Sequence, residues 1–139
     1  MKDYKIHGLF PIPVYMTGID REFTKEELEF VDEVCQSYLN NVVCPKKDIK
    51  IYVTQSWLNY TEENEFHHKH EHPNSFASGV LYIDSNKETD LIKFFNPISY
   101  KQISPEINKD KYNPYNSSSW FFPVETGEII MFPSSTTHQ

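Results

Sequence analysis

The sequence predicts a mainly β fold, an antiparallel β-sandwich or jelly roll with one amphipathic helix packed outside. Strand-like segments follow one another from residue 50 onward with no helical pattern between them. The one helical pattern lies before them, between residues 24 and 41. With 139 residues, the chain is long enough for one core, so we expect a single domain over residues 1–139.

The first part of the chain combines an extended opening with this helix. Residues 4–18 alternate apolar side chains with Pro11, Pro13 and Gly18, which favours strands over a helix. The helix should begin at Thr24, which can form a capping box with Glu27, and end near Asn40 and Asn41. An apolar stripe at helical spacing should pack against a sheet, and its members are Leu28, Val31, Val34, Cys35, Tyr38 and Leu39.

The second part is predicted to consist of strands. Runs of β-branched and aromatic residues occupy the segments 51–60, 77–83, 91–95, 120–124 and 127–132. Residues 97–119 are rich in Asn, Ser, Lys, Tyr and Pro and should form a long loop. Trp57 and Trp120 are expected in the core or at the rim of the fold rather than against a substrate.

Composition and charge exclude several classes of protein. The net charge of −7 argues against the phosphate backbone of a nucleic acid as the main partner. There is no apolar run of 18 residues and no apolar signal-peptide segment, so we expect a cytoplasmic protein without a membrane partner. Cys35 and Cys44 do not have a metal-binding spacing, and Cys35 should be a reduced, buried thiol.

Histidines gather at the ends of two predicted strands. His67, His68, His70 and His72 precede the segment 77–83, and His138 follows the segment 127–132. Neutral imidazole is the commonest protein ligand for iron, copper, nickel and zinc. Residues i and i+2 of an extended segment point to the same side, so His70 and His72 should face a common point. With a distant third histidine, the pattern predicts a mononuclear metal site.

Other interpretations of these residues remain open. A histidine-rich tract can also be a solvated loop or a cluster of core imidazoles. His67 and His68 are interpreted as lying behind the ligands or on the surface, because neither has the strand pairing of His70 and His72. Glu71 should point away from the metal if the segment is extended, which argues against a ligand pair formed by His70 and Glu71.

The segments around the histidines resemble a known family, the 2-oxoglutarate/Fe(II) oxygenases found in marine phages and bacteria. The similar segments are 56–60, 66–75, 78–83, 120–124 and 127–134, ending at His138, and the resemblance covers roughly residues 10–139. It implies a cupin-like double-stranded β-helix with iron at one mouth of the barrel. It also implies Fe(II) as the metal and 2-oxoglutarate as the cosubstrate.

The resemblance assigns roles to particular residues. In the wider superfamily the ligands follow the pattern His-x-Asp/Glu and a distant His. Here His72 takes the carboxylate position, so the implied ligands are His70, His72 and His138. Three neutral imidazoles do not cancel either positive charge of Fe(II), so a bound 2-oxoglutarate would have to supply the negative charge. Asn59, eleven residues before His70, and Tyr82 are the implied 2-oxoglutarate contacts. Ordinary strand packing is the alternative for both.

One family feature is missing. A basic residue, usually arginine, follows the distal histidine by roughly nine or ten residues and binds the distal carboxylate of 2-oxoglutarate. This chain ends at Gln139, and its only arginine, Arg21, precedes the predicted helix. We therefore expect a truncated sequence that lacks the final strand, in preference to a lysine such as Lys93 in the arginine's place.

Taken together, the sequence predicts an Fe(II)- and 2-oxoglutarate-dependent dioxygenase that hydroxylates an unknown prime substrate. A peptide, a small metabolite or a nucleobase would fit, whereas duplex DNA is disfavoured by the acidic charge. One alternative is a cupin-like enzyme with a three-histidine metal that does not use 2-oxoglutarate. Another is a non-enzymatic β-sandwich module, such as a binding or structural part of a phage particle. A homodimer would cover the exposed strand edge.

Overall fold

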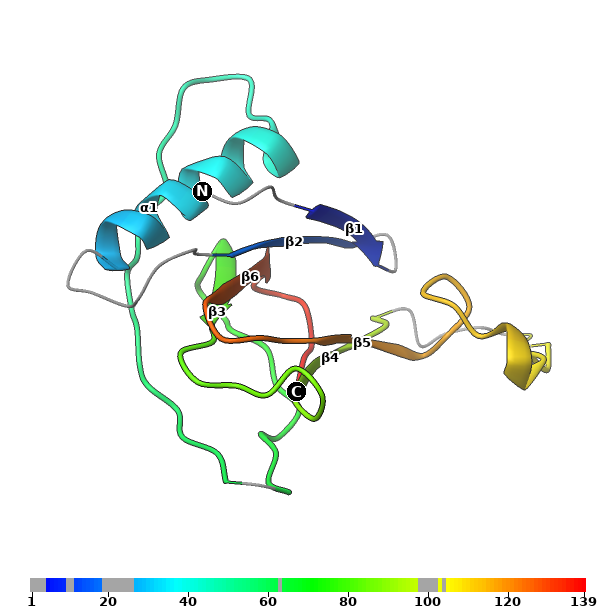
Figure 1. Ribbon diagram of the computed structural model, residues 1–139. Coiled ribbons are helices and arrows are strands. Elements are labelled where there is room, and N and C mark those ends of the chain that lie inside the picture. Colours follow the sequence, from blue (N-terminus) through cyan, green and yellow to red (C-terminus); the bar gives the residue numbers. More distant parts are fainter. Residues whose placement is uncertain (1–4, 10–11, 19–26, 63, 98–102, 104) are drawn as a thin grey trace.

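The strands of the protein form two sheets, and its helix covers one of them (Figure 1). The computed structural model describes residues 5–9, 12–18, 27–62, 64–97, 103 and 105–139. The four-stranded sheet has the order β1-β2-β6-β3, with β1 Lys5–Leu9, β2 Ile12–Gly18, β6 Glu128–Pro133 and β3 Ala77–Leu81. The other sheet pairs β4 with β5, at Leu91–Phe95 and Ser119–Pro123. All of these pairings are antiparallel.

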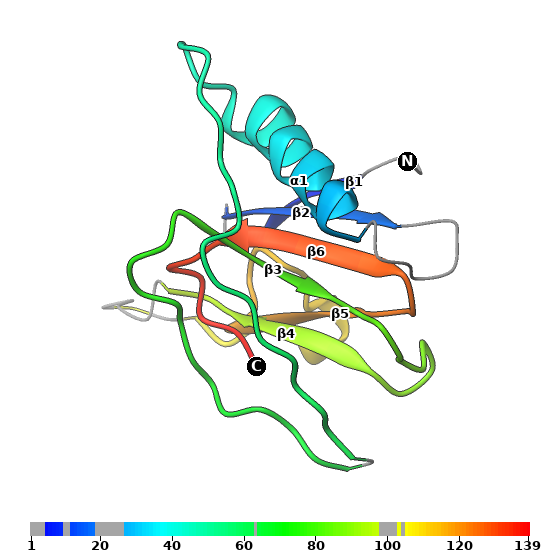
Figure 2. The same cartoon turned by 90° about the vertical axis from the view of Figure 1, so that its left-hand side faces the viewer.

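The middle of the fold is β6, which is buried on both faces. Its run of four apolar residues, Ile129 to Phe132, is buried throughout, as expected for a strand covered from both sides. Ile129 and Met131 face helix α1, and Ile130 and Phe132 face the second sheet. Figure 2 shows these layers in turn: α1, the four-stranded sheet, and then β4 with β5.

Helix α1, Glu27–Tyr38, packs on the outer side of the four-stranded sheet through one face. The buried members of this face are Phe30, Val34, Cys35 and Tyr38. A π-helical turn, Leu39–Val43, follows and ends at Cys44, whose N–H donates to the carbonyl of Leu39 (2.9 Å). The helix therefore ends close to the predicted position, and its predicted start at Thr24 lies outside the described residues.

The two sheets face each other across a second cluster of apolar side chains. Phe94 of β4 and Phe132 of β6 lie at its centre, with ring centroids 5.1 Å apart. The remaining buried members are Ile92, Val124 and Ile130, flanked by Met16, Val80, Tyr82, Trp120 and Phe122. Mainly strands, one outer helix and a core between two small sheets agree with the predicted β-sandwich.

Several sequence predictions are confirmed by the strands. The extended opening forms β1 and β2, and the predicted segments 77–83, 91–95, 120–124 and 127–132 overlap β3 to β6 with ends that differ by no more than two residues. Cys35 is a buried free thiol as expected, and Cys44 is also free. Within the described part of 97–119, regular structure before β5 is limited to the short 3-10 helix Lys109–Lys111. No described helix is both long enough and apolar enough to cross a bilayer.

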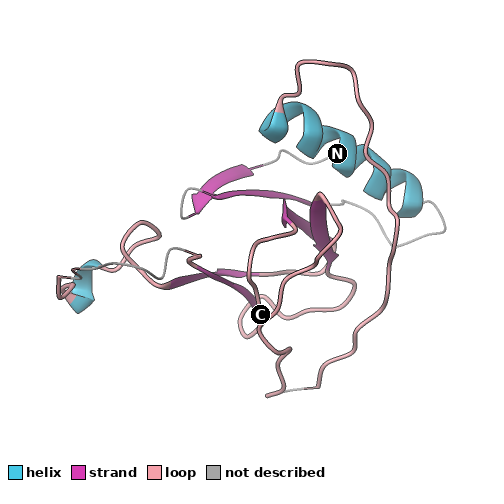
Figure 3. Ribbon diagram, turned by 180° about the vertical axis from the view of Figure 1, so that it is seen from behind, coloured by secondary structure: helices cyan, strands magenta, loops and turns pink. Residues whose placement is uncertain are grey.

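Two sequence predictions about local structure are wrong. Residues 51–60 form no strand, and all of them except Ile51 have exposed side chains. Figure 3 shows this stretch as part of a long loop that leaves α1 and runs past the sheets. Leu28 does not belong to the buried helix face, because 71% of it is exposed, and Phe30 packs against the sheet instead.

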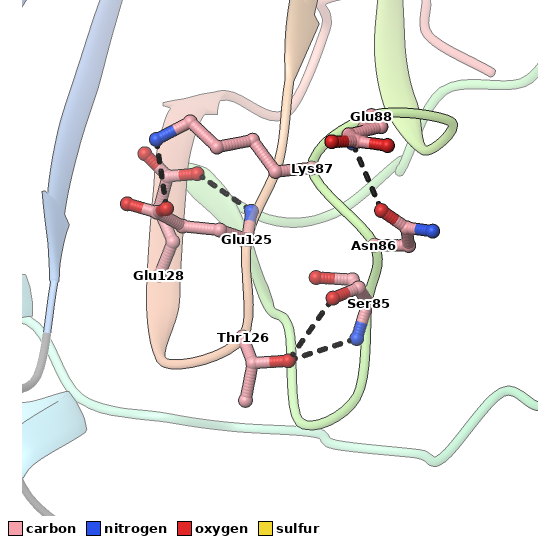
Figure 4. A network of polar contacts seen from close by, with 7 residues as sticks. All are labelled: Ser85, Asn86, Lys87, Glu88, Glu125, Thr126 and Glu128. Atoms are coloured by element: carbon pink, nitrogen blue, oxygen red, sulfur yellow. Dashed lines mark hydrogen bonds and ion pairs between the residues drawn. The ribbon is translucent and has the colours of Figure 1, made fainter.

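Polar contacts between two loops close the end of the sandwich where β6 begins (Figure 4). The hydroxyl of Thr126 accepts from the N–H of Ser85 (2.9 Å) and donates to its carbonyl (3.2 Å). Nearby, Lys87 forms an exposed ion pair with Glu125 (2.8 Å). The opposite end of β6 leads into Ser134 and the residues that follow, which is where the histidines lie.

Candidate metal centre

Backbone pairing brings the distant histidines together. His70 and His138 form an antiparallel β-bridge in which each N–H donates to the carbonyl of the other residue, both at 3.0 Å. The N–H of His72 donates to the carbonyl of Ser134 (3.0 Å), which keeps the two segments side by side. On its other side, His138 forms a bridge with Phe94 of β4. His138 is therefore held between the histidine segment and the second sheet.

The three imidazole rings converge on one point. Ring centroids are 4.3 Å apart for His70 and His138, 4.8 Å for His70 and His72, and 5.0 Å for His72 and His138. One nitrogen of each ring lies within 4.8 Å of the others, close enough for one ion to bind all three. In the part of the chain that the structure describes, this is the one such group of His, Cys, Asp or Glu side chains.

Hydrogen bonds orient two of the rings for metal binding. Nδ1 of His70 lies 2.8 Å from the carbonyl of His68, and Nδ1 of His138 lies 2.9 Å from the carbonyl of Thr136. A carbonyl can only accept, so each Nδ1 carries the proton and donates it. The lone pair then remains on Nε2, as in many metal sites where a backbone group fixes the tautomer of a histidine ligand.

Burial favours the neutral form of His138 and His72, which is the form that binds metal. His138 is only 4% exposed and packs against Phe132, with ring centroids 4.6 Å apart. Its pKa is lowered to about 4, mainly by desolvation and to a smaller extent by the charges of His70 and His72, against the opposing effects of the Thr136 carbonyl and Glu71. Burial, followed by the charge of His70, also lowers the pKa of His72.

A pH dependence of stability follows from the buried His138. Its pKa is near 6.5 in the unfolded chain and about 4 in the folded one, so the unfolded state binds more protons between these values. We expect the metal-free protein to lose about 1–2 kcal/mol of stability between pH 7 and pH 5 from this residue. Urea unfolding at both pH values measures the loss, and His138→Gln should remove most of it. An equal loss in both proteins would contradict the prediction.

Glu71 lies on the opposite side of the histidine segment from the three rings. Its Oε1 accepts a hydrogen bond from the hydroxyl of Thr137 (2.7 Å), the residue before His138. This placement agrees with the expectation that Glu71 points away from the metal. A ligand pair formed by His70 and Glu71 is therefore not supported.

The remaining histidines of the cluster lie at the edge of the site. The ring of His68 is 5.1 Å from that of His70, and its carbonyl orients the His70 ring. The ring of His67 is exposed and lies 3.4 Å from the hydroxyl of Thr61. Neither joins the three converging rings, in line with their interpretation from the sequence.

Trp57 lies beside the histidines, which the sequence analysis missed. Its ring centroid is 5.4 Å from that of His72, and 57% of the residue is exposed. Of the two expected positions, core or rim, the core is therefore excluded for Trp57, and the half-buried Trp120 packs against the core between the sheets. The sequence offered one hint of this position: Trp57 belongs to the segment 56–60, which is one of the segments that carry the family resemblance.

The two residues predicted to contact 2-oxoglutarate, Asn59 and Tyr82, lie in different surroundings. Asn59 is exposed, two residues after Trp57. Tyr82 is half-buried against the core between the sheets, and its backbone pairs with Glu128 and Gly127 at the far end of β6. Burial raises the pKa of the Tyr82 phenol, and the carboxylates of Glu128 and Asp90 add to this effect. Asn59 and Tyr82 as 2-oxoglutarate contacts stay predictions.

Lys93, the alternative to the missing arginine, belongs to the outer face of β4. Its ammonium lies 5.3 Å from the centroid of the Phe95 ring, and that of Lys69 lies 4.1 Å from the same ring. Phe94, between Lys93 and Phe95, points the other way, toward His138 and the core. This alternation places Lys93 on the wrong side of the strand to bind a molecule at the three rings.

Comparison with known proteins gives a single finding. A family model described as "Putative 2OG-Fe(II) oxygenase" matches residues 55–139, where 2OG stands for 2-oxoglutarate. The match includes all three converging histidines and Trp57, and it begins later than the resemblance expected from residue 10. No curated protein and no solved structure shows significant similarity to the chain.

Proposed function

Because the chain belongs to the 2OG-Fe(II) oxygenase family, we propose that it is a dioxygenase that hydroxylates a C–H bond of an organic substrate. The family implies Fe(II) and 2-oxoglutarate, and the three-histidine cluster fits a metal site. The observation that carries the proposal is the convergence of His70, His72 and His138 within the matched region. We assign these three residues as the ligands of the iron.

Each part of the chain near the rings has a role in this proposal. The β-bridge and the two carbonyl hydrogen bonds fix His70 and His138, so the ion would meet nitrogens already turned toward it. Phe132 and Phe94 keep water away from the buried side of His138. When bound, iron and 2-oxoglutarate supply the oxidising chemistry, in which O₂ is consumed and 2-oxoglutarate loses CO₂ to give succinate.

The ligand set bears on how the cosubstrate would bind. Three neutral imidazoles leave the charge of Fe(II) uncompensated, so an anionic 2-oxoglutarate should bind more favourably than at a site with a carboxylate ligand. Asn59 is the better supported of the two proposed contacts, because Trp57, two residues earlier, lies against His72. The facing sheets, with the histidines at one end, support the double-stranded β-helix that the family resemblance implies.

The net charge of the chain limits the class of prime substrate. With 20 acidic and 13 basic residues, the protein is better suited to a small metabolite or peptide than to duplex DNA. Trp57 lies beside the ring of His72 and is largely exposed to solvent. We propose that its exposed face contacts the substrate, since aromatic faces bind flat or apolar groups well.

An anaerobic titration of the Fe(II)-loaded protein with 2-oxoglutarate tests the proposed function. We expect a visible charge-transfer band that reaches a plateau at one 2-oxoglutarate per iron, since a 2-keto acid can chelate a metal through its keto oxygen and an oxygen of the adjacent carboxylate. Succinate, which lacks the keto group, is the control and should give no band.

The same titration separates this function from its rivals. Stoichiometric iron without a band would favour the three-histidine enzyme that does not use 2-oxoglutarate, a hypothesis that the histidine in the carboxylate position supports. A protein that binds no stoichiometric iron would contradict both enzymes and leave the non-enzymatic module.

A further inference from the structure

The side of the strand pair opposite the three rings carries a second connection between the ligand segments. Glu71 lies between His70 and His72 in the sequence, and Thr137 immediately precedes His138. Their side chains meet through the 2.7 Å hydrogen bond from the Thr137 hydroxyl to Glu71 Oε1. The hydrogen bond therefore lies directly behind the backbone bridge that joins His70 to His138.

The position of Glu71 gives it an electrostatic connection to the site as well. Glu71 lies between two of the proposed ligands and is hydrogen-bonded to the residue before the third, so its charge is close to all three, although the side chains point to opposite faces. The nearest positive group on the same segment, Lys69, has its ammonium over the ring of Phe95. Glu71 is thus a negative charge held by a hydrogen bond next to a ligand set that has none of its own.

We infer that Glu71 is a charge-balancing and positioning residue: its carboxylate, held by Thr137, compensates from behind the strand for the carboxylate that the three-histidine ligand set lacks. This inference rests on the proposed metal site. A dication bound by three neutral rings is stabilised by any fixed negative charge nearby, and the carboxylate needs no contact with the metal to act. Its effect is moderate, because Glu71 is exposed and solvent screens its charge.

The chain offers matched variants that separate charge from hydrogen bonding. Glu71→Gln keeps the size of the side chain and an oxygen that can accept from Thr137, and it removes only the charge. Thr137→Val removes the hydroxyl and keeps the carboxylate. Glu71→Asp keeps the charge on a shorter side chain. Co(II) affinity, measured by competition with a chelator, is the readout, because it requires neither iron nor oxygenase activity.

We expect Glu71→Gln to weaken Co(II) binding about threefold at low ionic strength, since the charge acts over several ångströms through partly solvated surroundings. The difference from the wild type should disappear in about 1 M potassium nitrate, where the Debye length is roughly 3 Å. Glu71→Asp should restore most of the affinity. Thr137→Val should have a smaller effect than Glu71→Gln, because the charge remains.

Two results would overturn the inference. Unchanged Co(II) affinity in Glu71→Gln would show that the charge does not reach the site. A loss of affinity that persists at high salt and is matched by Thr137→Val would show a purely structural hydrogen bond. The variant His138→Ala tests the metal site separately from the role of Glu71. If this variant binds Co(II) as tightly as the wild type, the proposed metal site is contradicted, and the role of Glu71 with it.

Discussion

Replacing His138 with alanine should lower the affinity for a divalent metal at least about 100-fold, because removing a ligand costs more than removing a group that only orients one. His138 is the best-fixed of the three rings. Its backbone is paired on both sides, its Nδ1 donates to the Thr136 carbonyl, and its ring packs on Phe132. Zn(II) or Co(II) competition titrations measure the loss, and iron content after anaerobic loading provides an independent value.

Two further variants make this result specific. His138→Ala leaves a buried cavity, so His138→Gln, which fills more of the space, shows whether the loss reflects misfolding rather than a missing ligand. His67→Ala is the matched control, since its exposed ring lies against Thr61 and outside the three converging rings. It should bind metal within about twofold of the wild type. High-affinity, stoichiometric metal in His138→Ala would contradict the proposed ligand set.

The convergence of the three histidines was predictable from the sequence because strand geometry is simple. Side chains alternate along a strand, so the spacing of His70 and His72 was enough to place them on one face and Glu71 on the other. The long apolar run before His138 indicated a buried strand. His138 follows this strand by only a few residues, so it was expected to lie near the strand's end. The pairing of His70 with His138 depends on tertiary contacts and was supplied by the structure.

The failures have a different physical origin. A strand exists only where a neighbour accepts its backbone hydrogen bonds, and the composition of 51–60 carries no information about such a neighbour. The strand-like pattern was therefore misleading, and the place of Trp57 beside His72 could not be seen. The prediction for Leu28 also failed: its spacing fits the apolar stripe, but its side chain is exposed and Phe30 packs against the sheet instead.

Lys93, the less favoured alternative to a truncated sequence, could have been excluded by the alternation of the strand alone. Ile92 and Phe94 are apolar neighbours that belong in the core, so Lys93 between them must face outward. The same rule does not settle the role of Tyr82. Its half-buried side chain packs against the core, the charges of Glu128 and Asp90 act on its phenol, and a bound dianion would have to overcome their repulsion. Residues that would contact 2-oxoglutarate are thus harder to predict from the sequence than a cluster of converging histidines.

Phe132→Ala should reduce the free energy of unfolding by about 3–5 kcal/mol, the usual cost of truncating a fully buried phenylalanine. Its ring is 0% exposed and contacts the rings of both Phe94 (5.1 Å) and His138 (4.6 Å). The cavity would therefore open between the core and a proposed ligand, and we expect weaker metal binding along with the lower stability. Urea unfolding of the metal-free protein measures the first effect, and a Co(II) titration measures the second.

The outer face of the second sheet supplies the control for this substitution. Phe121 of β5 pairs with Lys93 across the strands and is 55% exposed, so Phe121→Ala removes the same group from outside the core. It should change stability by only about 0.5 kcal/mol and leave Co(II) affinity unchanged. Equal destabilisation by the two substitutions would mean that the core does not lie between the sheets as described. Loss of stability in Phe132→Ala with unchanged metal affinity would instead mean that backbone pairing alone holds His138 in place.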